Sequence, residues 1–543
     1  MDILNFLFWL VHLALSLLRR CGKGLLWLAG QLFKRRPTTF GSAGWAGFWQ
    51  LLFSGALGRK GIIVGKKFGR FLRYSGEGAV MAVAPMGSGK GAGLVIPALL
   101  DYPGAVICTD PKGENEYTTG EFRQTLGPVY RLDAITPARS DCYNPLDIIR
   151  RNSETEFDDA LILADLLVVP EGSDAHWDTS AKNTLAACIM YVMRTRPEPE
   201  HTLAAVARLI DDEGETLRET FAAMAGWPEQ SIASIGKTAL RGLDNDEFLS
   251  VMSNTSKALK IWASDRIAGR LSMKSNFDLM DVHSTTMTLY VMVPEELLQV
   301  YGPYMRVIMG CVMAVLVRGK QRKRAAVKPL LLIDECQALG RLEALERGVG
   351  YLRSYARLML ITQDWGRMRA LYGEHGLDSF IAASGAQVLF GVNDLRTARD
   401  LAEILGPRTV HTRSHGQSQA NTDMVRRQDQ AGTAEAARHL LDASEIMRLK
   451  ARQAIVRMNT LRYPVRAGKV RFFKERRWAG LWRNWLDRDD APELVSFESA
   501  DPSPAPGVEN GGRVGAGSPE FPANPPIRRQ SGQSPHPPAS AVS

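Results

Sequence analysis

A glycine-rich turn in the first quarter of the chain has the residue types that bind phosphate. Residues 79–84 form an apolar run, AVMAVA, that leads into PMGSGKG at 85–91. Glycines allow backbone N–H groups to converge on phosphate oxygens, and a helix that starts after such a turn adds favourable polarity. Lys90 would reach the β- and γ-phosphates of a nucleotide. The predicted nucleotide-binding residues are Gly87, Ser88, Gly89, Lys90 and Gly91.

This turn departs from the pattern GxxxxGK[ST] at both ends. Ala84 stands where the first glycine is usual, and Gly91 stands where Ser or Thr normally binds Mg²⁺. Taken alone, the turn is compatible with an ordinary loop as well as with a nucleotide site, so other motifs must decide.

Two further motifs supply acids and an amide at the ends of apolar runs. Residues 330–333 are four aliphatic side chains followed by Asp334 and Glu335. We expect Asp334 to hold Mg²⁺ through water and Glu335 to polarise the attacking water of a hydrolysis reaction. Acids at the end of a buried strand are costly unless a cation or substrate meets them. Gln363, after the run 358–361, fits a sensor that reads the γ-phosphate or positions water, or a capping amide at a strand end. In combination the motifs predict an ATP-hydrolysing enzyme.

The pattern of apolar runs predicts an α/β fold that positions these motifs. Six short runs are typical of buried parallel strands, and helical stretches alternate with them. They lie at 79–84, 105–108, 287–293, 330–333, 358–361 and 387–392. Residues 151–280 have helical periodicity and almost no strand signal, which predicts an all-α insertion. We therefore predict a nucleotide-binding domain at 59–150 and 281–475, followed by a basic and then Pro/Gly/Ser-rich disordered tail at 476–543.

The N-terminus contains three apolar segments, Ile3–Leu18, Gly24–Phe33 and Phe40–Leu57. We predict that residues 1–58 form a membrane anchor with one or two spans; the alternative is a buried hydrophobic hairpin at an oligomer interface. A hairpin of spans at 3–18 and 40–57 would place the intervening basic residues outside, against the positive-inside rule. A single span with an outside N-terminus would place them against anionic headgroups inside.

The net charge of +9 is unevenly distributed along the 543 residues. Residues 1–73 hold twelve Lys/Arg and one acid, and residues 151–250 hold eight bases and nineteen acids. The segment 452–488 holds eleven bases and two acids, which could contact a DNA backbone or lie at the membrane face. The net value therefore says little about DNA. The scattered cysteines and the 45% hydrophobic content exclude a disulfide scaffold and a disordered chain.

Several local motifs together resemble those of the type IV secretion coupling proteins, the TraG-like conjugation ATPases, over about residues 75–475. The shared motifs are SGKG at 88–91, DPKGE at 110–114, YNPL at 143–146, DECQALG at 334–340, Gln363, and GVN at 391–393. The resemblance implies a RecA-like P-loop NTPase that uses ATP and Mg²⁺ and forms a homo-hexamer at the bacterial inner membrane, with its ATPase domain in the cytoplasm. It also implies single- or double-stranded DNA, relaxase proteins and secretion-channel components as partners, with relaxase-bound DNA or effector proteins as the substrate that is brought to the channel.

The resemblance further implies an arginine that reaches the neighbouring subunit's nucleotide. Arg353 resembles that position, and Arg396 and Arg399 are candidate second contacts. Lys112 could touch nucleotide or form a local ion pair with Glu114. Two other functions stay open at this point: a docking receptor that binds nucleotide without hydrolysing it, and an FtsK/HerA-like DNA translocase outside conjugation.

Overall fold

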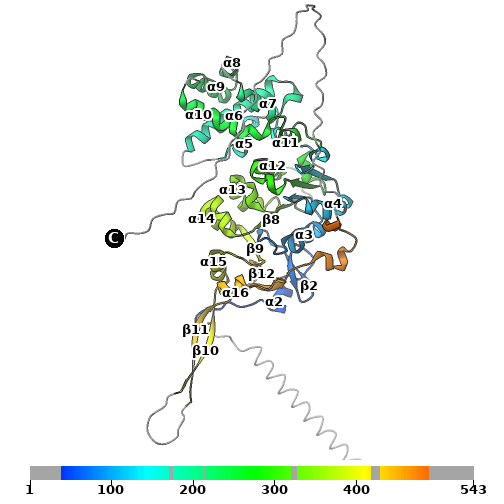
Figure 1. The fold of residues 1–543 in the computed structure, drawn as a ribbon, viewed down its shortest axis with the longest axis vertical. Coiled ribbons are helices and arrows are strands. Elements are labelled where there is room, and N and C mark those ends of the chain that lie inside the picture. The colour runs from blue at the N-terminus through cyan, green and yellow to red at the C-terminus, as the bar shows by residue number, and fades with distance from the viewer. Residues whose placement is uncertain are drawn as a thin grey trace, which may run out of the picture. The chain divides into compact units, whose positions relative to one another are not determined.

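The computed structural model describes residues 38–169, 175–212, 215–243, 245–319, 327–417 and 429–487. All of them belong to one compact unit, which extends to Pro492 (Figure 1). The apolar segments predicted at 3–18 and 24–33 lie outside the described residues, and so does the Pro/Gly/Ser-rich tail.

One mixed sheet of eleven strands forms the centre of the unit. Seven strands are parallel, in the order β9 (Ser384–Leu389), β3 (Ala79–Val83), β8 (Arg357–Thr362), β7 (Leu330–Ile333), β4 (Val106–Thr109), β6 (Thr288–Met292) and β5 (Val129–Asp133). The predicted α/β fold is confirmed, although β9 starts three residues before the apolar run at 387–392. The sequence prediction missed β5, whose side chains are mostly half-buried and include Arg131 and Asp133.

Four antiparallel strands extend the sheet beyond β9. Their order outward is β12 (Gln453–Met458), β13 (Val465–Gly468), β1 (Ile62–Lys67) and β2 (Arg70–Tyr74). The C-terminal strands β12 and β13 therefore lie between the parallel core and the first two strands of the chain, β1 and β2. This arrangement brings residues near 469 to the glycine-rich turn, although almost 380 residues separate them.

Helices cover both faces of the sheet, because alternate side chains of each parallel strand point to opposite faces. On β3, Met81 joins the core beneath α12 (Leu298–Arg318), α13 (Glu343–Leu352) and α14 (Trp365–Ala383). Its neighbour Ala82 joins the opposite core, which includes side chains of α3 (Ile96–Asp101). Helix α4 (Glu114–Leu126) packs beside α3.

Helix α12, with the turn before it, is the one segment among the described residues that is long and apolar enough to cross a membrane. Its most apolar window is 78% buried inside the unit. Gly310 allows close packing there, since a Cβ at this position would meet the Leu166 side chain at 2.2 Å. These contacts are those of a core helix.

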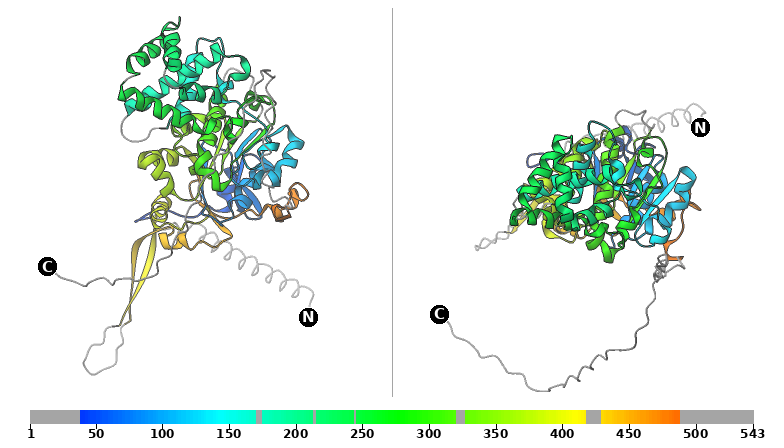
Figure 2. Two further views of the ribbon diagram at one scale, coloured as in Figure 1. Left: turned by 45° about the horizontal axis from the view of Figure 1, so that its top comes forward. Right: turned by 90° about the horizontal axis from the view of Figure 1, so that it is seen from above.

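Seven helices lie between β5 and β6, and no strand occurs among the described residues from 151 to 280. They are α5 (Glu156–Leu167), α6 (Ala175–Thr195), α7 (Leu203–Asp211), α8 (Glu215–Ala225), α9 (Gln230–Gly242), α10 (Asp246–Leu259) and α11 (Ile267–Leu271). Figure 2 shows this helical segment from two further sides.

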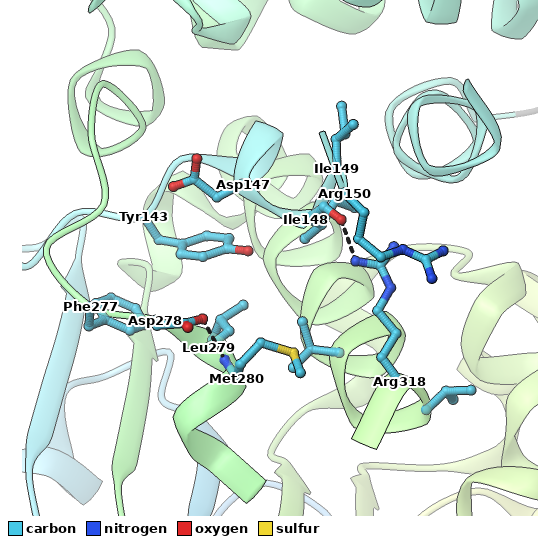
Figure 3. A pocket seen from close by; sticks show the side chains of 12 residues that line it. Tyr143, Asp147, Ile148, Ile149, Arg150, Phe277, Asp278, Leu279, Met280 and Arg318 are labelled. Atoms are coloured by element: carbon cyan, nitrogen blue, oxygen red, sulfur yellow. Dashed lines mark hydrogen bonds between the residues drawn. The ribbon is translucent and has the colours of Figure 1, made fainter. Parts of the chain in front are cut away.

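The junction between these helices and the sheet contains a cavity of about 700 Å³ (Figure 3). Tyr143 and Arg150 line it from one chain segment, Phe277 and Asp278 from another, and Arg318 from the end of α12. The YNPL motif is part of this junction. Its asparagine, Asn144, caps the following turn through Leu146 N–H and donates to the carbonyl of His201 at 2.6 Å. This motif therefore has an anchoring role in the fold.

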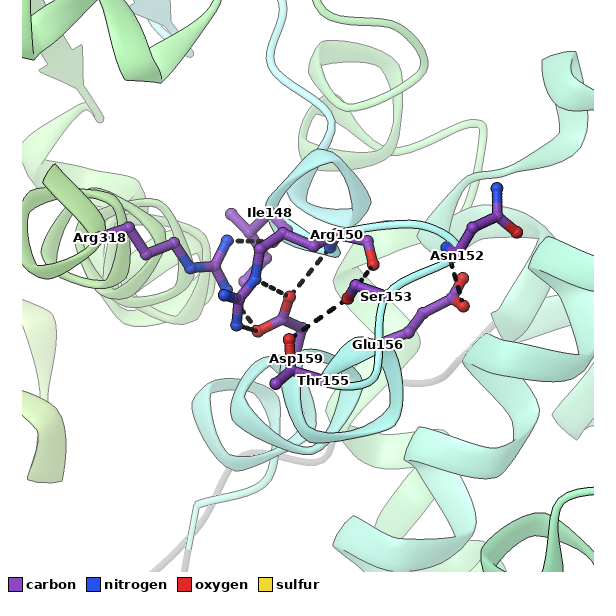
Figure 4. Close-up of polar contacts among 8 residues, drawn as sticks. All are labelled: Ile148, Arg150, Asn152, Ser153, Thr155, Glu156, Asp159 and Arg318. Atoms are coloured by element: carbon purple, nitrogen blue, oxygen red, sulfur yellow. Dashed lines mark hydrogen bonds and ion pairs between the residues drawn. The ribbon is translucent and has the colours of Figure 1, made fainter. Parts of the chain in front are cut away.

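A buried carboxylate ties α5 to α12 beside this cavity (Figure 4). The Asp159 side chain is completely buried, and it accepts from Arg150 at 2.8 and 2.9 Å and from Arg318 at 2.6 Å. Burial opposes ionisation, but the hydrogen bonds and charges of the two arginines lower the pKa of Asp159 below its ordinary value. The cluster ties the start of the helical segment to α12, which covers one face of the sheet.

The apolar segment 40–57 is folded onto the sheet, so the two-span alternative does not fit the structure. Its one helix, α2 (Phe48–Phe53), has six residues, far fewer than the roughly 20 that a span needs. Leu51 is fully buried, and Ala46 N–H donates to the carbonyl of Pro464 at 2.9 Å. The backbone of this segment is thus a part of the α/β core.

A separate two-stranded hairpin, β10 (Pro407–Gln417) and β11 (Asp429–His439), was also missed. Figure 1 shows it extending away from the sheet. Its sequence lacks the apolar alternation on which a strand prediction depends.

Candidate nucleotide-binding site

Three adjacent strands bring the predicted motifs to one edge of the sheet. The order β3, β8, β7 places the glycine-rich turn, Gln363 and Asp334–Glu335 side by side, because the carboxyl ends of parallel strands share an edge. A cavity of about 250 Å³ opens there. Its lining includes Gly87, Gly89, Lys90, Gly91, Asp110, Asp334 and Glu335.

The turn has the backbone that a phosphate cradle needs. Gly87 and Gly89 have φ of +71° and +82°, a region that residues with a Cβ rarely adopt. The chain then enters the helical turn Gly91–Val95 and α3, so that N–H groups of a helix start face the cavity. The hydroxyl of Ser88 is buried and has no hydrogen-bond partner among the described residues. An oxygen ligand in the cradle would satisfy it.

Lys90 extends from this turn to both acids. Its Nζ lies 2.9 Å from Asp334 Oδ1 and 2.7 Å from Glu335 Oε1. Burial lowers the pKa of Lys90, but the charges and hydrogen bonds of the two acids outweigh it, so the pKa is above its ordinary value. Lys90 is therefore a fixed positive charge at the cavity.

The backbone at the acidic pair is held in an unusual conformation. Glu335 has φ of +56° and ψ of +58°, the left-handed region, which costs a residue with a side chain about 1 kcal/mol or more. Thr109 Oγ1 donates to the carbonyl of Asp334 at 2.9 Å and steadies this turn. Gln363 Nε2 donates to Glu335 Oε1 at 3.3 Å. The amide and the acid predicted to handle water thus touch each other.

The cavity has an excess of acids that suits a divalent cation. Burial and the nearby charge of Asp334 raise the pKa of Asp110 to about 7, although the N–H of Glu116 donates to it at 2.8 Å. Burial raises the pKa of Asp334, and burial also raises that of Glu114. Carboxylates crowded in this way ionise together more readily when Mg²⁺ is bound. The donor set therefore fits a magnesium nucleotide.

Asp110 was not predicted as a site residue, although it belongs to the DPKGE motif. It follows the apolar run 105–108 as Asp334 follows 330–333, and this parallel was the signal available in the sequence.

Lys469 is a second residue that the sequence prediction missed. It follows β13, and its Nζ donates to the carbonyls of Ser88 and Phe390 at 2.9 Å each. The same Nζ lies 4.4 Å from the centre of the Phe390 ring. Burial lowers the pKa of Lys469 to about 8. Lys469 is a positioning residue, because it reaches the glycine-rich turn through the backbone of Ser88.

Other cations of the basic C-terminal segment are also engaged within the unit. Arg477 pairs with Asp101 of α3 at 2.7 Å, and Arg483 pairs with Glu121 of α4 at 3.2 Å. Trp478 between them is 1% exposed. The α/β unit therefore includes residues beyond 475.

The predicted arginines are not among the residues that line this cavity. Arg353 is exposed at the amino end of β8, the opposite edge of the sheet, where its carbonyl accepts from Lys328. Arg399 is exposed on α15 (Leu395–Leu405), and Arg396 of the same helix pairs with Glu374. Within the described part of the chain, neither Arg353 nor Arg399 forms a side-chain ion pair. Lys112 lines the cavity but pairs with Glu295 at 3.2 Å rather than with Glu114.

This combination of parallel sheet, glycine-rich turn, lysine and acidic strand end defines a P-loop nucleotide-binding protein. A family model described as "Type IV secretory system Conjugative DNA transfer" matches residues 51–499. The chain therefore belongs to this family, the type IV coupling proteins, and the resemblance of the sequence motifs is confirmed.

Relatives of known name agree with this assignment. Protein VirD4 of Rhizobium rhizogenes is 30% identical over 463 residues, which cover 80% of this chain and 66% of VirD4. Conjugal transfer protein TraG of Escherichia coli is 27% identical over 400 residues, which cover 70% of this chain and 63% of TraG. The chain thus spans just under two thirds of the length of these curated relatives.

Solved structures share the fold. The bacterial conjugative coupling protein TrwBdeltaN70 superimposes with a TM-score of 0.60 at 14% identity, over 80% of this chain and 95% of that one. TrwB in complex with the ATP analogue ADPNP gives 0.59 at 14% identity, over 80% and 96% of the two chains. TrwB with ADP and Mg²⁺ also gives 0.59 at 14% identity, with the same coverage.

Proposed function

We propose that this protein is a coupling ATPase of a type IV secretion system, which recruits DNA with its attached relaxase and drives the DNA to the secretion channel. The observation that supports this most is the convergence of Lys90, Asp334, Glu335 and Gln363 at one cavity. A receptor that bound nucleotide without hydrolysing it would have no use for the contact between Glu335 and Gln363.

Binding of a magnesium nucleotide would exchange the partners of Lys90. The triphosphate oxygens would replace the carboxylates as partners of its Nζ, and backbone N–H groups of Gly87–Gly91 would hold the phosphates. Asp334 would then be free to hold the hydration shell of Mg²⁺, which neutralises phosphate charge when bound. Because Gly91 has no hydroxyl, it would give a bound Mg²⁺ no side-chain ligand, and water or another residue would have to take that place.

Glu335 and Gln363 would handle the attacking water. Once Lys90 turns to the phosphates, Glu335 Oε1 keeps one neutral donor, the Gln363 amide, and can accept a hydrogen bond from water. Gln363 would sense whether the γ-phosphate is present and transmit this to β8, because it is the residue directly after that strand. An arginine from a neighbouring subunit would stabilise the transition state, with Arg353 the first candidate and Arg399 the second.

The assembly and location follow from the family role. Relatives called conjugal transfer protein and type IV secretion coupling protein support DNA, relaxase and channel components as partners. We propose a homo-hexamer, since Arg353 lies at the edge of the sheet opposite its own Lys90 and could act only in a neighbour. The apolar N-terminal segment would anchor the protein in the bacterial inner membrane, with the nucleotide-binding part in the cytoplasm.

Plasmid transfer by cells with Lys90→Ala tests this function. We expect loss of transfer at unchanged protein level, whereas Lys237→Ala, an exposed lysine on α9, should keep it. Transfer that persists with Lys90→Ala would favour the docking receptor. Failure of the purified protein to capture a relaxase, with ATP turnover intact, would favour a DNA translocase outside conjugation.

A further inference from the structure

Four exposed aromatic side chains form one contiguous surface beside the first two strands; we call them the aromatic patch. Phe48, Trp49 and Phe53 lie on α2, and Phe68 lies at the turn between β1 and β2. Ring centres are 5.5 Å apart for Phe48–Trp49 and for Phe48–Phe68, and 5.9 Å apart for Trp49–Phe53. The four residues are 41, 66, 82 and 54% exposed in that order.

The backbone beneath the patch is fixed, so the rings cannot fold inward. Leu51, on the other side of α2, is fully buried. Ala56 and Leu57 after the helix are buried too, and the carbonyl of Ala56 accepts from Arg73 N–H at 2.8 Å. The exposure of the aromatic patch is therefore a stable property of the fold, and large apolar surfaces of this kind mark an interaction site.

The chain segment that carries the aromatic patch is basic, although two of its cations, Lys66 and Arg73, pair with Glu475 and Asp101 from other segments. Residues 38–73 contain six Lys/Arg and no acid. Arg59, Lys60 and Arg70 are exposed, and Lys67 Nζ lies 5.2 Å from the Phe68 ring centre. Aromatic rings framed by cations match the interface of an anionic bilayer, where rings lie at headgroup level and Lys/Arg meet the lipid phosphates.

We propose that the aromatic patch docks the nucleotide-binding unit onto the surface of an anionic lipid bilayer. This inference rests on the membrane anchoring proposed above. From Phe33, the end of the preceding apolar segment, to Phe48 there are 15 residues, which span about 50 Å at most. A chain anchored at Phe33 would therefore keep α2 within about 50 Å of the membrane, and docking would fix the orientation of the unit on it.

The arrangement of the rings favours lipid over nucleic acid. Single strands bind where aromatic faces stay open for successive bases. Here Phe48 packs against Trp49 and Phe68 at interplanar angles of 73° and 74°, and Trp49 stacks on Phe53 at 20°. Each ring thus has another ring of the patch against it, and together they present a continuous apolar surface.

Site-specific photo-crosslinking in the full chain tests the proposal. Phe53 is replaced by p-benzoylphenylalanine, an aromatic residue that an 82% exposed position accepts. The protein is reconstituted in nanodiscs of phosphatidylglycerol, illuminated, and its adducts are identified by mass. The control has the same photoreactive residue at Tyr351, an aromatic that is 49% exposed on α13.

We expect about tenfold more lipid adduct at position 53 than at position 351. In phosphatidylcholine discs the adduct at position 53 should decrease severalfold, because Lys and Arg are attracted to an anionic surface. Crosslinks at 53 to a second copy or to added DNA instead of lipid, or equal lipid adducts at the two positions, would overturn the proposal. If the protein does not enter the discs, this result contradicts the proposed membrane anchor alone. The lipid adducts formed at positions 53 and 351 with added phosphatidylglycerol vesicles then test whether the aromatic patch binds lipid.

Discussion

Replacement of Lys469 by methionine is expected to weaken nucleotide binding about tenfold. The change removes two hydrogen bonds of 2.9 Å from an ammonium group, to the carbonyls of Ser88 and Phe390. A hydrogen bond from a charged donor contributes about 1.5–3 kcal/mol, and only one of the two reaches the glycine-rich turn. Loss of about 1.5 kcal/mol from the positioning of that turn corresponds to about a tenfold change.

Methionine preserves most of the packing at this position. Its thioether can stay against the Phe390 ring, now 4.4 Å from Nζ, because sulfur and aromatic rings attract each other. The thermal midpoint should therefore move little. Fluorescent-nucleotide titration measures the affinity, with Lys474→Met, a lysine on the surface nearby, as the control.

The low pKa of Lys469 supplies a second readout. Since burial lowers this pKa to about 8, the wild-type side chain is charged at pH 7 and mostly neutral at pH 9. Wild-type affinity should fall between these pH values more than that of Lys469→Met. Unchanged affinity of the variant at pH 7, with an intact fold, would refute the role of Lys469 in positioning the turn.

Three further variants test other parts of the structure. Gly91→Ser should lower the Mg²⁺ concentration for half-maximal turnover about fivefold, because a Cβ there meets nothing within 4 Å and the hydroxyl adds a ligand. The control Gly91→Ala should leave this concentration unchanged. Equal Mg²⁺ curves for the two variants would contradict a metal beside residue 91. Asp159→Asn should lower the free energy of unfolding by about 3 kcal/mol in urea titrations, because Arg318 and the half-exposed Arg150 lose the charge of their buried partner. A loss under 1 kcal/mol would argue against the anchoring cluster. Asp110→Asn tests the raised pKa of Asp110. In the folded state this carboxyl keeps its proton up to about pH 7, whereas in the unfolded state it releases the proton near pH 3.8, so wild-type stability falls as the pH rises between these values. By thermal unfolding without nucleotide, the variant should be more stable than wild type by about 4 kcal/mol at pH 8 and equal to it at pH 3. Equal stability at both pH values would contradict the ionisation of Asp110 in the folded state.

The parallel core was predictable because its strands are continuous apolar runs. All six predicted runs correspond to β3, β4, β6, β7, β8 and β9. The acids and the amide that follow β7 and β8 were identified for the same reason, since a polar residue after such a run must lie at the sheet edge. The pairing of Lys90 with both acids follows from the strand order, which the sequence does not state.

The missed features depend on contacts between distant segments. Residues 40–57 have the composition of a membrane span, yet Leu51 is buried against the sheet while Trp49 is exposed. Composition treats these two apolar residues alike, and only the folded structure shows which of them is buried. Lys469 resembles any other base of a basic segment until β13 brings it to Ser88. Edge strands such as β5 alternate buried and exposed residues too weakly to predict.

The most direct test of the account is DNA-stimulated ATP turnover by the full chain and by Glu335→Gln. The account predicts turnover that rises with DNA in the wild type. In the variant, ATP binding should stay within about threefold while turnover falls about a hundredfold or more, as expected when a general base is removed. Wild-type protein that binds ATP without hydrolysing it, or a variant that hydrolyses ATP at the wild-type rate, would contradict a motor driven from this site.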